Sequence, residues 1–334
     1  MIKPAESRNQ KTVEVNMIKR PLEQLFFATF RGKQDFQDFI KLDLAASSIK
    51  KNFEGRSVYA PEPKLKLYLG FLSRVLFDRL PLAEQVVYSY RKGVNVVNAV
   101  EKHSSSKYFF QTDIESFFGS INREMIRRSI LWSLDFCPIS DIDIWIDRIL
   151  DIVTVDGLLP PGFPTSPAIS NCCLVKFDEE FLSWCDSQGF IYTRYADDLI
   201  VSSKVDPGVD LLISKITEIL NKMFDGDFKL NLNKTRVVRP GSKVKLLGVV
   251  ILPNGKVSID GNLKKNAETA MYHLLKNKEK FVSFLKEQEL DRALQKFSGQ
   301  LNYINTVDPD FLDKLRRKYG ATAVDKIIHV SVAV

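Results

Sequence analysis

The stretch IYTRYADDLIVSS (191–203) constrains the fold more than any other part of the chain. It places two adjacent carboxylates, Asp197 and Asp198, between two short runs of β-forming residues. At a separation of about 4 Å and an effective dielectric constant of about 20, two such charges repel each other by roughly 4 kcal/mol. A turn between buried strands more often uses Asn-Gly or Asp-Gly. The pattern therefore predicts a β-hairpin whose acidic turn serves chemistry, with a water-exposed turn pair as the alternative.

A second candidate strand also ends in a carboxylate. KYFFQTD (107–113) is short, almost fully apolar, and ends at Asp113. If this strand pairs with the 191–203 hairpin, three carboxylates converge at one edge of a sheet, and such a cluster is stabilised by divalent cations. Carboxylate oxygens select Mg²⁺ or Mn²⁺, and two such ions about 3.5–4 Å apart catalyse in-line phosphoryl transfer. The cluster therefore predicts a two-metal site.

Strand and helix patterns alternate along the chain, which predicts the α+β class. A Gly/Pro-rich loop interrupts the middle of the chain at 156–167, and the chain from Leu263 onward is mostly helical and rich in lysine. The other expected elements are a mostly helical segment 1–50, a strand within 54–63, helices over 64–80 and 122–132, and a hairpin within 243–259 that turns at Pro253-Asn254-Gly255.

Composition sets broad limits on the class of protein. The chain has 334 residues, 45% of them hydrophobic, which is enough to form a core and to divide into two or three lobes. Its net charge of +7 suits a nucleic-acid partner, although a solvated basic surface explains the excess equally well. No apolar run reaches the roughly 18 residues of a membrane span, and the polar N-terminus lacks the pattern of a signal peptide. We therefore expect a cytoplasmic protein without a membrane partner.

The four cysteines fit neither a zinc site nor a disulfide framework. We expect them to be buried free thiols in a reducing compartment. They are Cys137, Cys172, Cys173 and Cys185.

Six motifs, in order along the chain, resemble those of one family. YADD, at the hairpin, is similar to the catalytic hairpin of reverse transcriptases, and TDIESFF (112–118) is similar to their first catalytic motif. The remaining motifs resemble the fingers motif of bacterial retron-type enzymes, the template- and nucleotide-positioning loop, a later palm motif and the primer-grip hairpin: GRSVYAP (55–61), LPPGFPTSPAISN (159–171), LNLNKT (230–235) and KVKLLGVVI (243–251). The chain is thus similar to bacterial retron-type reverse transcriptases. A retron enzyme proper and another defence-associated reverse transcriptase both remain open.

This resemblance implies a right-hand polymerase fold. It implies N-terminal helices and fingers over 1–106, an antiparallel palm over 107–260 with a fingers insertion around 122–165, and a small helical thumb over 261–334. The implied reaction is RNA-directed DNA synthesis with two Mg²⁺ ions, with Mn²⁺ as a substitute. In it, the primer 3′-hydroxyl attacks the α-phosphate of a deoxynucleoside triphosphate and pyrophosphate leaves.

The resemblance also implies catalytic roles for four residues. Asp113 and Asp197 would be metal ligands, and Asp198 would be the third carboxylate of the metal site. Lys234 would protonate the pyrophosphate leaving group, although NLNKT around it could equally be a plain turn.

Further residues are implied to bind the substrate. Arg56 would grip the triphosphate, for which a planar guanidinium is suited. Phe118 would exclude a 2′-hydroxyl by steric clash, and the alternative is that Phe118 is a core residue and Phe117 the exposed one. The loop residues Pro160, Gly162 and Ser166 would hold the nucleotide base and the template by shape.

The implied partners are a structured non-coding RNA template, the nascent DNA and deoxynucleoside triphosphates. A role in anti-phage defence follows from the resemblance alone, and an effector protein and a homo-oligomer remain open. The Lys-rich stretch 274–288 suits a thumb helix against a duplex, or simply a solvated amphipathic face. We expect His103 to lie in a solvated polar turn, with RNA contact as the alternative. The rival functions are a catalytically silent RNA-binding scaffold that kept the fold and a two-metal nuclease.

Overall fold

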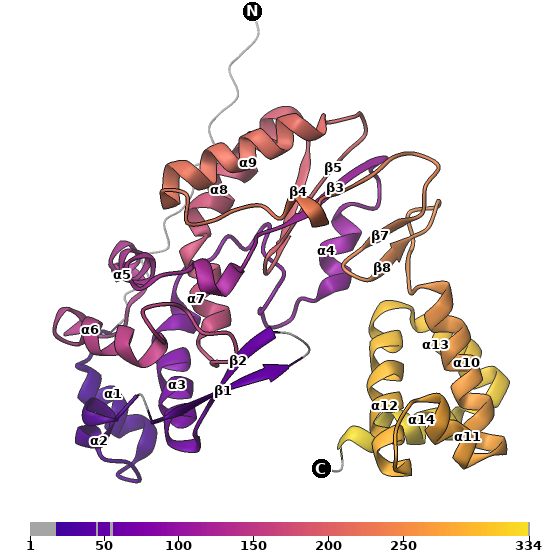
Figure 1. The fold of residues 1–334 in the computed structure, drawn as a ribbon, viewed down its shortest axis with the longest axis horizontal. Coiled ribbons are helices and arrows are strands. Elements are labelled where there is room, and N and C mark those ends of the chain that lie inside the picture. The colour runs from indigo at the N-terminus through magenta and orange to yellow at the C-terminus, as the bar shows by residue number, and fades with distance from the viewer. Residues whose placement is uncertain (1–17, 45, 54–55, 333–334) are drawn as a thin grey trace, which may run out of the picture. The chain divides into compact units, whose positions relative to one another are not determined.

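The computed structural model describes residues 18–44, 46–53 and 56–332 (Figure 1). The chain divides into two compact units. The first consists of Met1–Pro81 with Phe118–Cys173, and the second of Leu82–Phe117 with Leu174–Val334. Helices combine with antiparallel sheets in the described residues, so the predicted α+β class is confirmed.

The first unit combines helices with one β-hairpin. Strands β1 (Ser48–Phe53) and β2 (Arg56–Pro61) pair antiparallel. The helices are α1 (Leu22–Phe30), α2 (Phe36–Lys41), α3 (Pro63–Val75), α5 (Arg123–Trp132), α6 (Ile142–Val153) and α7 (Ser166–Cys173), with 3-10 turns η1 (Phe77–Arg79) and η3 (Leu134–Phe136).

Aromatic rings form the core of the first unit. Phe26 lies at the centre, and its ring centroid is 4.5 Å from that of Phe30 and 5.4 Å from those of Phe36, Phe39 and Phe71. Tilted and edge-on pairs of this kind add about 0.5–1.5 kcal/mol each beyond the area that they bury. Helix α3, which carries Phe71 of this core, also contacts β2.

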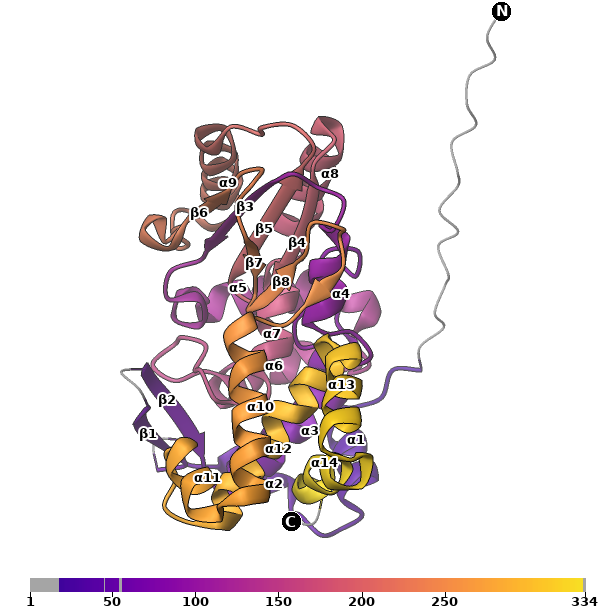
Figure 2. The same ribbon diagram turned by 90° about the vertical axis from the view of Figure 1, so that its right-hand side faces the viewer.

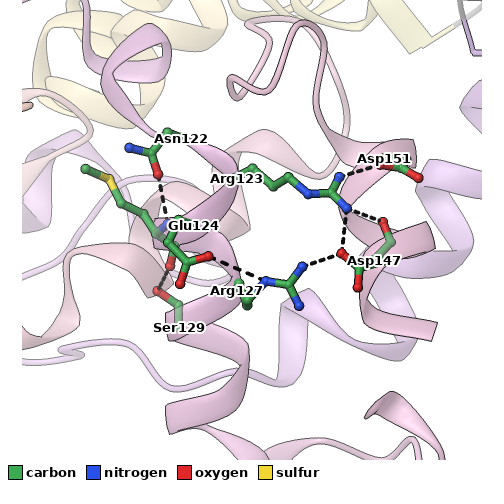
Figure 3. Close-up of polar contacts among 8 residues, drawn as sticks. Asn122, Arg123, Glu124, Arg127, Ser129, Asp147 and Asp151 are labelled. Carbon is green, nitrogen blue, oxygen red and sulfur yellow. Dashed lines mark hydrogen bonds and ion pairs between the residues drawn. The ribbon is translucent and has the colours of Figure 1, made fainter. Parts of the chain in front are cut away.

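Helices α5 and α6 of the first unit are joined by a charged surface network (Figure 3). Helix α5 begins after Asn122, whose side chain caps it by accepting a hydrogen bond from the Met125 amide. Arg123 then donates to Asp147 at 2.8 Å. It also bonds Asp151, while Arg127 bonds Asp147. Because these groups are partly exposed, the ion pairs contribute little to the free energy of unfolding. They link α5 to α6 at the surface.

The second unit is built on an antiparallel sheet in the order β4-β5-β3-β6. Helix α8 packs against β4 and against α9, as Figure 1 shows. The elements are α4 (Val96–Lys102), β3 (Tyr108–Asp113), α8 (Val175–Gln188), β4 (Ile191–Tyr195), β5 (Asp198–Ser203), α9 (Val209–Phe224), η4 (Leu232–Lys234) and β6 (Arg236–Val238). The 3-10 turn η2 (Phe117–Ser120) begins with the last residue of this segment of the second unit, and its other residues belong to the first unit.

A second sheet and a helical bundle complete this unit, and Figure 2 shows the helices gathered together. Buried residues of β3, β5, β7, β8 and the bundle form one continuous hydrophobic cluster that includes Phe109, Ile200, Leu246 and Phe297. The elements are β7 (Val244–Leu246), β8 (Val249–Ile251), β9 (Val257–Ser258), α10 (Gly261–Lys276), α11 (Lys278–Phe284), α12 (Leu290–Val307), α13 (Pro309–Tyr319), α14 (Ala321–Ile328) and η5 (His329–Val332).

Three sequence predictions need correction. Residues 48–50, at the end of the segment expected to be mostly helical, belong to strand β1, because pairing with β2 overrides their local pattern; residues 1–17 of the same prediction lie outside the described residues. Helix α3 ends at Val75 and continues as a 3-10 turn, since the residue before Pro81 is extended. The predicted hairpin within 243–259 is a three-stranded sheet, because Leu247-Gly248 forms a second turn with positive φ at both residues.

Two other predictions hold. All four cysteines are free and buried. No helix in the described part of the chain is long and apolar enough to cross a membrane.

Candidate active site

The three carboxylates lie at the end of two paired strands. Strand β3 pairs antiparallel with β5, and Asp113 lies directly opposite Asp198. Residues paired in this way project from the same face of a sheet, with Cβ atoms about 4.5–5.5 Å apart. Asp197 is in the turn between β4 and β5, and its carbonyl accepts a hydrogen bond of 3.0 Å from the Ile114 amide. The predicted pairing of the two acidic segments is confirmed.

Each strand carboxylate has one polar neighbour. Lys234 donates to Asp113 Oδ2 at 2.7 Å, and Gln111 donates to Asp198 Oδ1 at 3.0 Å. Burial raises the pKa of Asp198, and the negative charges of Asp197 and Asp113 raise it further. The hydrogen bond from Gln111 lowers this pKa. The three carboxylates are thus close enough to repel one another, as the adjacent acids in the sequence indicated.

Asp113 carries an unsatisfied acceptor. Its side chain is buried, and Oδ1 has no hydrogen-bond partner among the described residues. A buried carboxylate oxygen without a donor is costly, and a cation would remove that cost. The all-oxygen donor set suits a hard divalent ion. The residues therefore fit a divalent metal, although no group of three or more His, Cys, Asp or Glu in the described ranges already has the spacing of a metal site.

The loop predicted to position the nucleotide is docked on β2. The Tyr59 amide donates to the Pro161 carbonyl at 2.8 Å, and Ser166 is buried with its hydroxyl on the Pro160 carbonyl at 2.6 Å. At Gly162 φ is +103°, and an added Cβ would lie 2.4 Å from the Tyr59 carbonyl oxygen. Only glycine allows the two backbones to approach this closely. The contact with β2 therefore constrains the backbone of the loop at Pro161 and Gly162.

Two neighbouring phenylalanines differ in exposure. In η2, Phe117 is buried and packs against Phe228, whereas Phe118 is only half-buried. This difference suits the predicted roles of Phe117 as a core residue and Phe118 as the sugar contact.

The predicted site residues fall into two groups. Asp113, Asp197, Asp198 and Lys234 belong to the second compact unit, where the structure brings them together. The others belong to the first unit: Arg56, which begins β2, together with Phe118, Pro160, Gly162 and Ser166.

Comparison with known proteins identifies the family. Residues 58–251 match the family model described as "Reverse transcriptase (RNA-dependent DNA polymerase)". The chain belongs to the reverse transcriptase family. Members of this family are RNA-directed DNA polymerases, which copy an RNA template and generally use divalent metal ions.

Curated relatives of this reverse transcriptase come from retrons. It is 29% identical over 280 residues to the retron Ec73 reverse transcriptase of Escherichia coli, covering 81% of this chain and 84% of the relative. It is 27% identical over 283 residues to the Escherichia coli retron Ec86 enzyme, covering 81% and 80%. A solved telomerase from Candida albicans has a TM-score of 0.41 at 12% identity, covering 79% of this chain and 51% of that chain.

His103 of the reverse transcriptase does not lie in a solvated turn, so that prediction is wrong. The ring is fully buried at the end of α4, 2.7 Å from Ser202 Oγ and 2.8 Å from Thr193 Oγ1. Burial lowers the pKa of His103 to about 3. Helix α4 packs against β4, and the ring lies on the strands of the β4–β5 hairpin.

This burial makes the stability of the enzyme depend on pH. The unfolded histidine binds a proton below about pH 6.5, whereas the folded one remains neutral down to about pH 3. Protonation therefore favours the unfolded state, and each pH unit below 6.5 costs about 1.4 kcal/mol. Between pH 7 and pH 5 we expect His103→Gln to lose about 2 kcal/mol less unfolding free energy than the wild type in urea titrations. The exposed His329→Gln serves as the control, and equal losses in wild type and His103→Gln would contradict the assignment.

The sequence patterns missed a buried charged pair in the reverse transcriptase. Asp178 on α8 and Arg194 on β4 are both fully buried, with 2.6 Å between Asp178 Oδ2 and Arg194 Nη2. A charge inside an otherwise buried strand was the available signal, because buried charges require partners. The partner itself was not apparent, since it lies 16 residues earlier on a helix.

Proposed function

We propose that this reverse transcriptase is a retron-type enzyme that extends a DNA primer on a structured non-coding RNA, using Asp113, Asp197 and Asp198 as its metal-binding carboxylates. One observation carries the proposal: Asp113 lies opposite Asp198 beside the Asp197 turn, with one buried oxygen of Asp113 left without a donor. When bound there, two Mg²⁺ ions would activate the primer hydroxyl and stabilise the charge of the leaving pyrophosphate. Mn²⁺ has the same ligand preference and would substitute.

The protein's own groups divide the remaining work. Asp113 and Asp197 ligate, and Asp198 supplies the third carboxylate, which Gln111 orients. The Lys234 ammonium, held 2.7 Å from Asp113, is proposed to give a proton to the leaving pyrophosphate oxygen. More than half of the Lys234 side chain is exposed, which leaves the proton accessible to a substrate. Chemistry of this kind depends mainly on positioning and on charge stabilisation.

Nucleotide selection is proposed to come from the other group of residues. Arg56 would bind the triphosphate by a planar, bidentate contact. Pro160 and Gly162 would present rigid backbone to the base and template, and Ser166 would maintain the loop through its bond to Pro160. Phe118 would close the sugar site against a 2′-hydroxyl.

The proposed biological role follows from the relatives of this reverse transcriptase. The curated relatives are retron enzymes, and retron-type resemblance suggests anti-phage defence in the cytoplasm with an effector protein; a homo-oligomer stays open. Fingers (1–106, with an insertion around 122–165), palm (107–260) and thumb (261–334) remain our proposed division. The grouping of 118–173 with the N-terminal helices supports the insertion, whereas residues 82–106 group with the second unit.

A primer-extension assay tests the function. The purified protein is incubated with an RNA template, a DNA primer, labelled deoxynucleotides and Mg²⁺, and we expect template-dependent extension. A silent scaffold would bind the RNA without extending the primer. A two-metal nuclease would shorten the labelled strand instead, so the three functions give three different products.

Phe118→Ala should relax discrimination against ribonucleotides. Removing the ring would make room for a 2′-hydroxyl, so ribonucleotide incorporation relative to deoxynucleotide incorporation should rise by about tenfold or more, with part of the deoxynucleotide activity kept. The measurement is single-nucleotide extension with matched ribo- and deoxyribonucleotides. Phe117→Ala is the matched control. If only Phe117→Ala relaxed the discrimination, the residue that excludes the 2′-hydroxyl would be Phe117. If neither variant relaxed it, another residue would exclude the 2′-hydroxyl.

A further inference from the structure

The catalytic turn contains a residue in a strained conformation. Ala196 directly precedes Asp197 and has φ +57°, in the left-handed region that non-glycine residues rarely adopt. A residue held there costs of order 1 kcal/mol or more and persists only where its surroundings fix it. The methyl side chain of alanine offers no hydrogen bond of its own, so other residues must hold this peptide.

Two buried side chains bond the backbone of Ala196. Its amide donates to Ser89 Oγ at 2.7 Å, and its carbonyl accepts from Arg194 Nη1 at 3.1 Å. Ser89 and Arg194 are both fully buried. Both polar groups of the strained residue are therefore fixed, one by each side chain.

Arg194 is itself held in place. Its Nε donates to Asp178 Oδ1 at 2.9 Å and its Nη2 to Asp178 Oδ2 at 2.6 Å, and the Tyr192 hydroxyl donates to Asp178 at 2.8 Å. Burial opposes the charge on Arg194, but Asp178 raises its pKa above the usual value. The guanidinium thus stays charged. Its third nitrogen, Nη1, donates to the Ala196 carbonyl.

Ser89 is fixed against the same strand. The segment that carries it is bonded alongside β4, with the Arg194 amide on the Val86 carbonyl at 2.8 Å and the Tyr88 amide on the Arg194 carbonyl at 3.0 Å. The position of the Ala196 peptide therefore depends on strand β4 through Arg194, on helix α8 through Asp178, and on this segment through Ser89.

Stability alone does not account for such a pair. Two buried charges lose their hydration, and apolar residues of similar volume are often as stabilising. We infer that Asp178, Arg194 and Ser89 are positioning residues, which hold the Ala196 peptide so that the Asp197 carboxylate points at the reacting centre. This inference rests on the proposed role of Asp197, and the three residues do not themselves touch the substrate.

Two single variants test the hydrogen bonds to the backbone of Ala196. Ser89→Ala removes the acceptor of the Ala196 amide. Arg194→Lys keeps a cation beside Asp178 but lacks the planar fork that reaches both Asp178 and the Ala196 carbonyl. In each we expect kcat for nucleotide addition to fall about tenfold to a hundredfold while KM for the deoxynucleotide changes less than about twofold. Hydrogen exchange of the Ala196 amide should accelerate in Ser89→Ala, and Mn²⁺ binding measured by electron paramagnetic resonance without nucleotide should weaken in both variants.

The matched control is Ser298→Ala. Ser298 is also fully buried in the second unit, and its hydroxyl donates to the Ile328 carbonyl at 2.9 Å in the helical bundle. It should lose a comparable amount of thermal stability and keep its kcat and its Mn²⁺ affinity. If Ser89→Ala and Ser298→Ala had the same kcat and the same Mn²⁺ affinity, the inference would be overturned.

An apolar replacement separates positioning from support of the fold. The triple variant Asp178→Leu, Tyr192→Phe, Arg194→Met removes the charges and the hydroxyl together, so none of these three side chains leaves another of them unpaired, and the Ala196 carbonyl loses its donor. We expect it to fold and still to have the reduced kcat, whereas a structural network would recover kcat together with stability. If the triple variant or Arg194→Lys did not fold, Ser89→Ala would decide.

Asp197→Asn is measured in parallel. An inactive Asp197→Asn with normal Ser89→Ala and Arg194→Lys would overturn the positioning inference alone. An active Asp197→Asn would overturn the proposed metal site beneath it.

Discussion

Replacing Asp197 by asparagine should abolish nucleotide addition while the protein stays folded. The change is nearly isosteric, and it removes the metal ligand that we propose, which would be worth several kcal/mol and corresponds to a loss of about a thousandfold or more in rate. It also removes one of the negative charges that raise the pKa of Asp198, so stability without metal should be unchanged or higher. Single-nucleotide extension and thermal unfolding measure the two effects.

The exposed Asp186 of α8 offers the matched control, since Asp186→Asn changes the same chemical group in the same unit. This variant should keep wild-type activity. An Asp197→Asn enzyme within tenfold of wild type would remove Asp197 from the metal site.

RNA binding should weaken steeply as the salt concentration rises. Each phosphate that lysine or arginine neutralises contributes about −0.7 to −0.9 to the slope of log affinity against log salt. With about six such contacts, affinity should fall roughly a thousandfold between 50 and 200 mM salt. Filter binding or fluorescence anisotropy gives the slope, with the RNA that we expect to co-purify with the protein as the ligand.

Helix α11 and its flanks offer the residues to change. Lys276, Lys278, Lys280 and Lys286 are all exposed there. Lys278→Gln with Lys280→Gln should reduce the slope by about 1.5 units if both lysines contact phosphates, while Lys222→Gln on α9 should leave it unchanged. Protein that purifies without RNA and shows a flat salt dependence would favour an enzyme without a dedicated RNA.

The sequence predicted the centre of the site because the relevant signals are local. The apolar run ending at Asp113 and the apolar flanks of Asp197 determine strand ends that meet in one sheet. The α+β class follows from the same alternation of patterns. Local periodicity and turn chemistry were sufficient here, since each element carries its own signal.

The supporting residues could not be found in this way. Whether Arg194 is exposed or buried depends on Asp178, which lies on a separate helix. His103 lies in a polar stretch, and only the packing of α4 on β4 buries it. Strand β1 likewise owes its conformation to β2. In each case a contact distant in sequence overrides the local pattern.

The four buried thiols make this enzyme convenient to label. Burial raises the pKa of Cys137, Cys172, Cys173 and Cys185, so almost none of each is present as the reactive thiolate at neutral pH. A single cysteine introduced at an exposed site such as Glu279 would therefore be the reactive thiol in the folded protein. Fluorescent or spin probes could then follow the helical bundle through a catalytic cycle without a cysteine-free background.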